Sequence, residues 1–343
     1  MIKRYKNNPV ITKDMMKASN PQYEAEYAIN PGVAEYNGET IMLIRVAEKV
    51  KDSGDTPNNI IKIPTANGII SVEKDLDGYD YSDPRVIHTP DNMLLTTMSH
   101  FKLARSRDGV SFTIDEKPAL YPDCRLELYG IEDARITKIE SVYYIVYTAV
   151  SDLGILPCLA TTTDFINFTK KGPIFHATNK DVVFFPEKID GMYVSLLRPM
   201  PSSCGTADIW LAKSPDALHW GEYTHILSPG PYDWNDGRIG AGLPPIKTEK
   251  GWLVITHSAA KKGDVYYMSA MLLDLTDPTK LISITKEPIM VPEEIYETNG
   301  FYGNVIFPSG GVCDGDNLRF YYGASDTSIC MAETTIGYLL SRL

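Results

Sequence analysis

A ten-residue pattern recurs three times along the chain, and its spacing limits the folds that the chain can adopt. The copies LARSRDGVSF, LATTTDFINF and LAKSPDALHW occupy residues 103–112, 159–168 and 211–220. Each reads Leu-Ala-x-Ser/Thr-x-Asp, with an aromatic residue four positions after the Asp. The copies start 56 and 52 residues apart (103 to 159, then 159 to 211). A period of this length is typical of solenoids and propellers and argues against a doubly wound sheet.

The Asp of each copy is expected to accept hydrogen bonds from the backbone amides of the turn that follows it. These residues are Asp108, Asp164 and Asp216. The aromatic residue of each copy is expected to cover the next hairpin. The pattern therefore predicts a structural role for these acidic residues.

Pairs of apolar segments joined by Asn-Gly, Asp-Gly or Lys-Gly turns lie between the copies, and this is the signature of β-hairpins. Such pairs occupy residues 32–46, 134–150, 184–199, 244–257 and 307–323. No comparable stretch keeps a helical period over more than a few turns. One sheet of about four strands, repeated around an axis, is a propeller blade. We predict an all-β fold, a five-bladed β-propeller that forms a single domain over residues 1–343.

The number of blades depends on one further hairpin, at residues 83–99, which would make a sixth unit. Residues 33–112, however, contain a single copy of the ten-residue pattern. We therefore predict that residues 30–118 form one blade with an inserted excursion at about 49–100, and six blades are the alternative. The polar, turn-rich stretch at 49–61 is typical of a long surface loop.

The charge of the chain argues against a nucleic-acid partner. Lys and Arg number 33 against 44 Asp and Glu, which gives a net charge of −11, whereas phosphate backbones require a basic face. No apolar run approaches the roughly 18 residues of a spanning helix, and the N-terminus is polar from the start. We expect a cytoplasmic protein without membrane contact, and a homo-oligomer remains open.

Polar residues at the starts of the repeats are the first candidates for a functional site. The innermost strands of a propeller converge on its axis, so these residues are expected to face a shared pocket. They are Asn30, Asp83, Asp133, Lys180, Asp181, Arg238 and Asn304. Residues that end the second strands can approach the same axis, namely Arg45, Tyr147, Arg198, His257 and Asp326.

Glu132 and Asp133 precede a strongly apolar strand in GIEDARITKI. Burial there would raise the pKa of a carboxyl group, and a raised pKa suits a general acid. The alternative is that Asp133 caps a turn, as expected for Asp83 in the similar stretch that contains Ser82 and Arg85. The residues alone favour neither interpretation.

Lys180, Arg198, Arg238 and His257 supply one cationic residue per repeat in an acidic protein. Directed at one axis, they would bind an oxyanion such as phosphate. The alternative is that each cationic residue pairs with a local acid such as Asp181 or Asp236. The residues alone favour this alternative. HxH, HExxH and GxSxG motifs are absent from the sequence, so neither a metal nor a resident cofactor is expected.

Five segments form a recognisable set, namely GIEDARITKI, NKDVVFFPEKI, LLRP, RIGAGLPPIKTEKGW and FYYGASDT. Together they resemble the motif set of glycoside hydrolase family 130, the mannoside phosphorylases and related mannosidases, and the resemblance spans about residues 7–340. It implies a five-bladed propeller that cleaves a β-mannosidic bond with inorganic phosphate. The reaction inverts the anomeric centre and releases α-mannose 1-phosphate.

The resemblance also implies a role for each matching residue. The family's catalytic acid falls on Asp133. Its phosphate ligands fall on Lys180, Arg198, Arg238 and His257, and its sugar contacts on Asn30, Arg45 and Asp326. We also expect Asp83 to bind the substrate, because it starts a repeat and faces the same axis. Lys180 stands where the family often has Arg, which keeps the charge but loses the bidentate fork.

A phosphorylase needs only an acid, because phosphate is already an anionic nucleophile, whereas an inverting hydrolase needs an acid and a base. One carboxylate with a group of cations therefore indicates phosphorolysis, and the family passes the proton through a mannose hydroxyl. We expect a short manno-oligosaccharide as substrate, with β-1,2-mannobiose ahead of β-1,4-linked mannosides. The alternatives are a β-mannoside hydrolase of the same fold and a non-catalytic carbohydrate-binding propeller.

Overall fold

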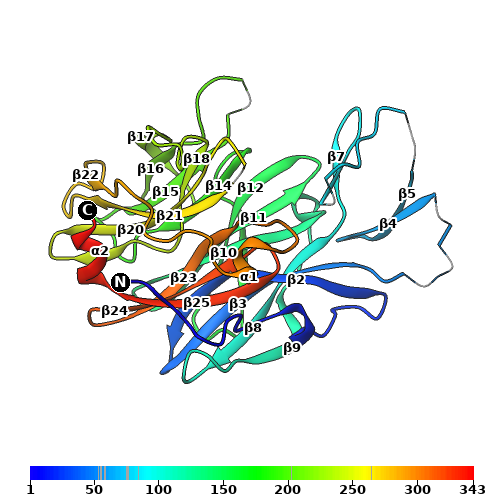
Figure 1. The fold of residues 1–343 in the computed structure, drawn as a ribbon, viewed down its shortest axis with the longest axis horizontal. Helices are drawn as coiled ribbons and strands as arrows, with labels where there is room; N and C mark the ends of the chain where they lie inside the picture. The colour runs from blue at the N-terminus through cyan, green and yellow to red at the C-terminus, as the bar shows by residue number, and fades with distance from the viewer. Residues whose placement is uncertain are drawn as a thin grey trace.

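The computed structural model describes residues 1–343 except 53, 55, 58, 75, 76, 84, 202 and 264. Antiparallel β-sheet dominates this part of the chain (Figure 1). Its helices are short, namely η1 (Lys13–Met15), η2 (Arg125–Glu127), α1 (Ile295–Thr298) and α2 (Ile336–Ser341). In the described residues, no helix has the length and apolar character needed to cross a bilayer. The all-β prediction is confirmed.

The first two sheets are four-stranded meanders. The first contains, in pairing order, β2 (Tyr23–Tyr36), β3 (Glu39–Val50), β8 (Met98–Ser106) and β9 (Thr113–Leu120). The second contains β10 (Gly130–Ile139), β11 (Val142–Ser151), β12 (Gly154–Thr162) and β13 (Thr169–Pro173). A parallel contact between Gly130 and Ser99 joins them into one continuous sheet.

Three further meanders follow along the chain. The third contains β14 (Asn179–Phe184), β15 (Tyr193–Pro199), β16 (Ile209–Ser214) and β17 (Gly221–Leu227). In the fourth, β18 (Arg238–Ala241) and β19 (Ile246–Thr248) share one partner, β20 (Gly251–Ala259), beside β21 (Tyr266–Leu273) and β22 (Leu281–Ile284). The fifth contains β23 (Ile306–Asp314), β24 (Asn317–Ala324), β25 (Ser328–Thr335) and the N-terminal β1 (Lys3–Arg4). Each of the five hairpins expected from the sequence lies within one meander.

The excursion runs between β3 and β8. It contains two separate hairpins, formed by β4 (Ile60–Thr65) with β5 (Gly68–Glu73) and by β6 (Val86–His88) with β7 (Met93–Leu95). Figure 1 shows β4 and β5 projecting to one side of the other sheets. Residues 53, 55 and 58 of the expected surface loop, and residue 84 of the expected extra hairpin, lie outside the described residues. The described part of residues 83–99 holds this short hairpin and the start of β8, and it forms no sixth meander.

The recurring Asp residues cap turns as expected. One carboxylate oxygen of Asp108 accepts from the amides of Val110 and Ser111, both at 2.8 Å. Asp164 and Asp216 each accept from the amides two and three residues later. These backbone hydrogen bonds lower the pKa of all three carboxyl groups.

The aromatic residues of the pattern do not share one role, because Phe112 contacts Tyr321 of the fifth meander whereas Trp220 contacts Phe184 of its own meander. The expectation that each covers the next hairpin is therefore too simple.

Apolar clusters join each meander to the next in a closed series. Leu43 shares a cluster with Ile145, Val146 with Phe184, and Phe185 with Trp252, which links the first meander through to the fourth. Leu253 then packs in one cluster with Phe320 of the fifth meander. The fifth returns to the first, because Tyr321 and Ile329 share a cluster with Met42 and Ile44.

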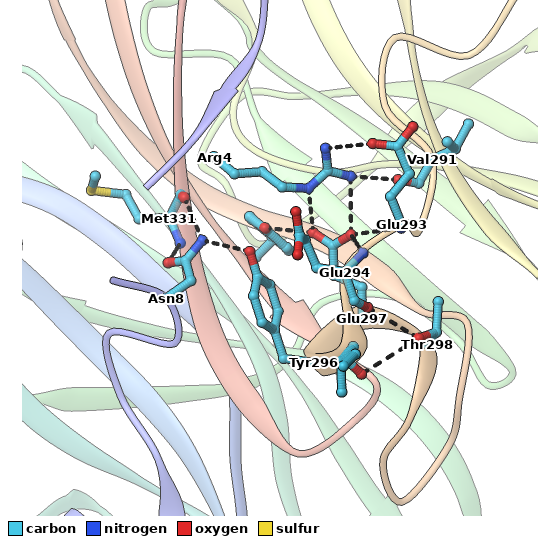
Figure 2. A network of polar contacts seen from close by, with 11 residues as sticks. Arg4, Asn8, Val291, Glu293, Glu294, Tyr296, Glu297, Thr298 and Met331 are labelled. Atoms are coloured by element: carbon cyan, nitrogen blue, oxygen red, sulfur yellow. Dashed lines mark hydrogen bonds and ion pairs between the residues drawn. The ribbon is translucent and has the colours of Figure 1, made fainter. Parts of the chain in front are cut away.

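The N-terminal strand is fixed by a partly buried ion pair (Figure 2). Arg4 donates from Nε to Oε1 of Glu297 at 2.8 Å and from Nη2 to Oε2 at 2.9 Å. The same carboxylate, which is fully buried, accepts from the hydroxyl of Tyr322 at 2.7 Å. Arg4 therefore ties β1 to α1 and to β24. Residues 299–305, which follow α1, supply Phe301 and Tyr302 to the cavity described next.

Candidate active site

The inner strands carry β-bulges at corresponding places. Asn30, Asp133 and Asp181 have φ angles of 45°, 51° and 52°, in the left-handed region that Asn and Asp tolerate better than most residues. The pairing register of β2, β10 and β14 shifts at each of these residues. A bulge turns a side chain out of the regular alternation. All three residues consequently line one cavity.

The cavity has a volume of about 280 Å³ and draws residues from all five meanders. The polar ones are Tyr27, Asn30, Arg45, Arg85, Thr97, Glu132, Asp133, Lys180, Asp181, Arg198, Tyr266, Tyr302 and Asp326. A larger hollow of about 860 Å³ lies nearer the C-terminal ends of β2, β10 and β23. None of the predicted site residues, all of which the structure describes, lines that hollow. The smaller cavity is therefore the candidate active site.

Asp133 lies within β10 and is held by two side chains. Its Oδ1 accepts from Nδ2 of Asn30 and from Nη1 of Arg45, both at 2.9 Å. Arg45 also donates from Nη2 to Oε1 of Glu132 at 2.7 Å, so its guanidinium spans both carboxylates. Nζ of Lys180 lies 3.8 Å from the other oxygen of Glu132. These contacts do not resemble the amide capping of Asp108, Asp164 and Asp216.

The expectation that burial raises the pKa of Asp133 is wrong. Burial acts in that direction, but Arg45, Lys180 and Arg135 together outweigh it and lower the pKa of this carboxyl below its usual value. The physical reason is that nearby cations favour the charged form more strongly than desolvation disfavours it. Asp133 is therefore ionised at neutral pH in this arrangement.

The raised pKa belongs to Asp326, in the turn between β24 and β25. Burial raises the pKa of Asp326 to about 6, against the opposing effect of Arg45, and the carboxylate of Asp133 adds to the increase. Two carboxyl groups in one cavity thus differ in charge near pH 6. Their environments, not their residue type, set the difference.

The raised pKa of Asp326 predicts a pH-dependent stability. A carboxyl group whose pKa is higher in the folded than in the unfolded chain favours folding when protonated, and this contribution disappears as the pH rises through about 6. We expect Asp326→Asn to raise the melting temperature at pH 7.5 relative to the wild type and to leave it nearly unchanged at pH 4. Thermal unfolding of both proteins across this range is the measurement. An equal shift at both pH values would contradict the prediction.

Arg198 and His257 meet on one carboxylate. Nε of Arg198 donates to Oδ2 of Asp181 at 2.6 Å, and Nε2 of His257 lies 3.1 Å from the same oxygen. Both residues therefore pair with an acid, as the alternative interpretation expected. Because the acid is the same one, Asp181, it also holds the two side chains close together. Burial lowers the pKa of His257 despite Asp181. This direction favours the neutral imidazole and opposes the expected cation, while the role of His257 at a phosphate site stays a prediction.

Two of the predicted phosphate ligands lie behind the cavity wall, namely Arg238 and His257. Arg238 donates from Nε to the hydroxyl of Tyr266 at 3.0 Å, and its guanidinium lies 4.8 Å from the centre of that ring. The ring of His257 lies 4.4 Å from that of Phe307. Tyr266 and Phe307 line the cavity, whereas Arg238 and His257 are not among its described lining residues.

Asp83 stands behind another lining residue, Arg85. It binds Arg85 through both carboxylate oxygens, at 3.0 Å and 2.8 Å, and Arg85 lies 4.2 Å from the ring centre of Tyr302. Sequence reasoning missed Arg85 and Tyr302, because nothing in the excursion or in residues 299–305 marks them as neighbours.

Arg135 is a further residue that sequence reasoning missed. It is buried, donates from Nη1 to the backbone carbonyl of Asp133 at 2.9 Å, and places Nη2 3.9 Å from Oδ1 of Asp181. An Arg two positions after Asp133, between the apolar residues Ala134 and Ile136, was the available signal. Arg135 connects the bulge of Asp133 to the carboxylate of Asp181.

Asp123, Cys124 and Glu127 form a possible metal-binding group in the described residues. Nζ of Lys170 lies 3.0 Å from Asp123 and 2.6 Å from Glu127, so one lysine already pairs with both carboxylates. The absence of a metal from the mechanism stays a prediction.

Comparison of this chain with known proteins identifies a family of carbohydrate-active enzymes. The family model described as β-1,4-mannooligosaccharide phosphorylase, that of glycoside hydrolase family 130, matches residues 94–342. The chain belongs to glycoside hydrolase family 130 and is an enzyme of its phosphorylase type.

The relatives extend this match to the whole chain. The β-1,2-mannobiose phosphorylase of Listeria innocua is 44% identical, over 100% of this chain and 98% of its own. Its structure in complex with β-1,2-mannobiose aligns with a TM-score of 0.95 over 100% and 99% of the two chains, at 43% identity. The 1,2-β-oligomannan phosphorylase of a Thermoanaerobacter species is 42% identical over 68% of this chain and 78% of its own.

The fold by itself does not separate phosphorolysis from hydrolysis. A solved structure associated with family members that hydrolyse β-1,2 mannosidic linkages in Candida mannan aligns with a TM-score of 0.76. It covers 98% of this chain and 94% of its own, at 22% identity. The residues around the cavity must therefore carry the distinction.

Proposed function

We propose that the enzyme cleaves β-1,2-mannobiose and short β-1,2-linked manno-oligosaccharides by phosphorolysis, releasing α-mannose 1-phosphate and the remaining sugar. The observation that carries this proposal is that Asp133 shares one cavity with Lys180 and Arg198. The linkage rests on the relative that matches the whole chain, and a β-1,4 linkage, as in the family description, is the alternative.

In the proposed reaction, Asn30, Arg45 and Asp326 hold the mannose, and Asp83 acts through Arg85. Phosphate binds beside Lys180 and Arg198, with Arg238 and His257 behind them. One phosphate oxygen attacks the anomeric carbon from the side opposite the glycosidic bond, so the configuration inverts. As that bond breaks, the leaving oxygen takes a proton that passes from Asp133 through a mannose hydroxyl. Inorganic phosphate is the co-substrate, and no further cofactor takes part.

In this mechanism, bound phosphate also changes the pKa of Asp133. Without phosphate, Arg45 and Lys180 lower this pKa and favour the ionised carboxylate. A bound dianion offsets the field of these cations, since like charges disfavour the charged carboxylate. Phosphate binding therefore raises the pKa of Asp133 and favours the protonated acid that cleavage needs.

We also infer that the five meanders are the blades of a five-bladed propeller in a single domain over residues 1–343. The closed series of apolar clusters supports this inference, because the fifth meander packs back onto the first. The excursion then belongs to the first blade, where it supplies Arg85, Val86, Met93 and Leu95 to the cavity wall.

Hydrolysis would require a carboxylate base near the phosphate site, and Asp181 is the residue that lies there. Its pKa is held well below the usual range, because Arg198, His257 and Arg135 outweigh its burial. A carboxylate with such a low pKa is a weak base. This favours phosphorolysis.

The decisive experiment incubates the enzyme with β-1,2- and β-1,4-mannobiose, each with and without inorganic phosphate. We expect β-1,2-mannobiose to be consumed only with phosphate, and ³¹P NMR to detect α-mannose 1-phosphate. Equally fast cleavage without phosphate would identify a hydrolase. Binding without cleavage under both conditions would identify a carbohydrate-binding protein.

A further inference from the structure

We propose that Asp181 is a positioning residue, which holds Arg198 and His257 in the arrangement that binds phosphate and does not itself act as a base. This inference rests on the proposed function. It assigns a role to a carboxylate that, by charge alone, would oppose phosphate binding in the same cavity.

The contacts of Asp181 connect three meanders. Its Oδ2 binds Arg198 of β15 at 2.6 Å and His257 of β20 at 3.1 Å, and its Oδ1 lies 3.9 Å from Nη2 of Arg135 in β10. All four side chains belong to buried residues, with exposed fractions of 7% for Asp181, 5% for Arg198, 1% for His257 and 2% for Arg135. A buried carboxylate shared by donors from separate strands fixes their relative positions.

The groups around Asp181 are incompletely paired. Nη1 of Arg198, Nδ1 of His257 and Nη2 of Arg135 are buried and have no hydrogen-bond partner among the described residues. Buried polar atoms are nearly always hydrogen-bonded. Of these three residues, Arg198 is the one in the described cavity lining, so its unpaired Nη1 indicates a ligand in the cavity. Asp181 engages Nε of Arg198 and leaves the Nη atoms of this lining residue for an oxyanion, which Arg binds through a planar fork.

Gly240 in β18 makes room for this arrangement. A Cβ atom at this position would lie 2.5 Å from Oδ2 of Asp181 and 2.8 Å from Nε2 of His257. Both distances are shorter than non-bonded atoms allow, so any side chain at position 240 must displace the Asp181–His257 pair. Gly240→Ala therefore disturbs the geometry without removing a charge.

The test measures initial rates with phosphate and β-1,2-mannobiose varied separately. We expect Asp181→Ala to raise the phosphate KM by about 10- to 100-fold, because Arg198 is no longer held in position to donate to phosphate. The mannobiose KM should change little. Asp181→Asn keeps an acceptor oxygen for Arg198 and should recover most of the loss. Gly240→Ala should also raise the phosphate KM selectively.

Two matched controls test the specificity of these effects. Asp208→Ala removes a carboxylate that likewise faces a histidine, His225 at 3.0 Å, but lies outside the described cavity wall. Gly221→Ala adds a methyl group where no atom lies within 4 Å. Both variants should keep the wild-type KM for phosphate and for mannobiose.

Three outcomes would overturn the proposal. A lower phosphate KM for Asp181→Ala would mean that Asp181 only competes with phosphate. An equal rise in both KM values would indicate a general structural role. A fall in kcat at unchanged phosphate KM would indicate participation in the chemical step.

A binding readout keeps the inference separate from the proposed function. Phosphate should raise the melting temperature of the wild type, and the increase should be smaller for Asp181→Asn and largely lost for Gly240→Ala and Asp181→Ala. This measurement does not depend on turnover. If the wild type cleaves mannobiose without phosphate, the proposed function fails, and the thermal shift still decides the role of Asp181. An undiminished shift in Gly240→Ala would refute that role even if Asp181→Ala does not fold.

Discussion

Asp133→Asn is expected to lower the turnover number of phosphorolysis by at least about 10²–10⁴-fold, the usual contribution of a general acid. The amide cannot release the proton that the leaving oxygen needs. The protein should remain folded, because Asn keeps an acceptor for Asn30 and Arg45 retains its bond to Glu132. The measurements are kcat at saturating phosphate and mannobiose, and thermal unfolding.

Asp164→Asn is the matched control, since Asp164 caps an exposed turn through backbone amides. It should keep the wild-type kcat. A folded Asp133→Asn enzyme with near-normal turnover would remove Asp133 from the mechanism. Unfolding of that variant would instead support a structural role for this carboxylate.

Arg198→Ala is expected to raise the phosphate KM by roughly 10- to 100-fold, which corresponds to about 1.5–3 kcal/mol for a hydrogen bond to a charged group. The effect should lie at the upper end, because the change also leaves Asp181 buried without its shortest hydrogen bond. The KM for mannobiose should change little, since Arg45 and Asp326 remain in place. The measurement is the initial rate against phosphate concentration at saturating disaccharide.

Lys180→Ala should act in the same direction as Arg198→Ala, because both residues line the cavity. Arg238→Ala should have a smaller effect, since Arg238 contacts Tyr266 and stands behind the wall. Arg319→Ala removes a partly exposed pair with Glu333, at 3.2 Å, and serves as the control. An unchanged phosphate KM in Arg198→Ala would exclude this residue from the phosphate site.

Local sequence determined the strands, the hairpins and the turns. Alternating apolar residues around Gly-containing turns predict hairpins, because side chains on a strand alternate between its two faces. The turn caps of Asp108, Asp164 and Asp216 could also be predicted, since their hydrogen bonds reach only two or three residues along the chain. The charged pair Glu132–Asp133 before an apolar strand marked Asp133 as a site candidate, whereas the bulge that turns its side chain into the cavity came from the structure.

The tertiary structure decided which residues meet and how they are charged. Arg45 and Asp133 are 88 positions apart, and His257 and Asp181 are 76 positions apart. Cations from other strands lower the pKa of Asp133, whereas burial beside that carboxylate raises the pKa of Asp326. The N-terminal strand completes the fifth meander by pairing with β25, and its Arg4 binds Glu297, which is 293 positions away. A sequence pattern describes only residues that are close along the chain. The contacts and pKa values of the site depend on distances in space, so they follow only from the tertiary structure.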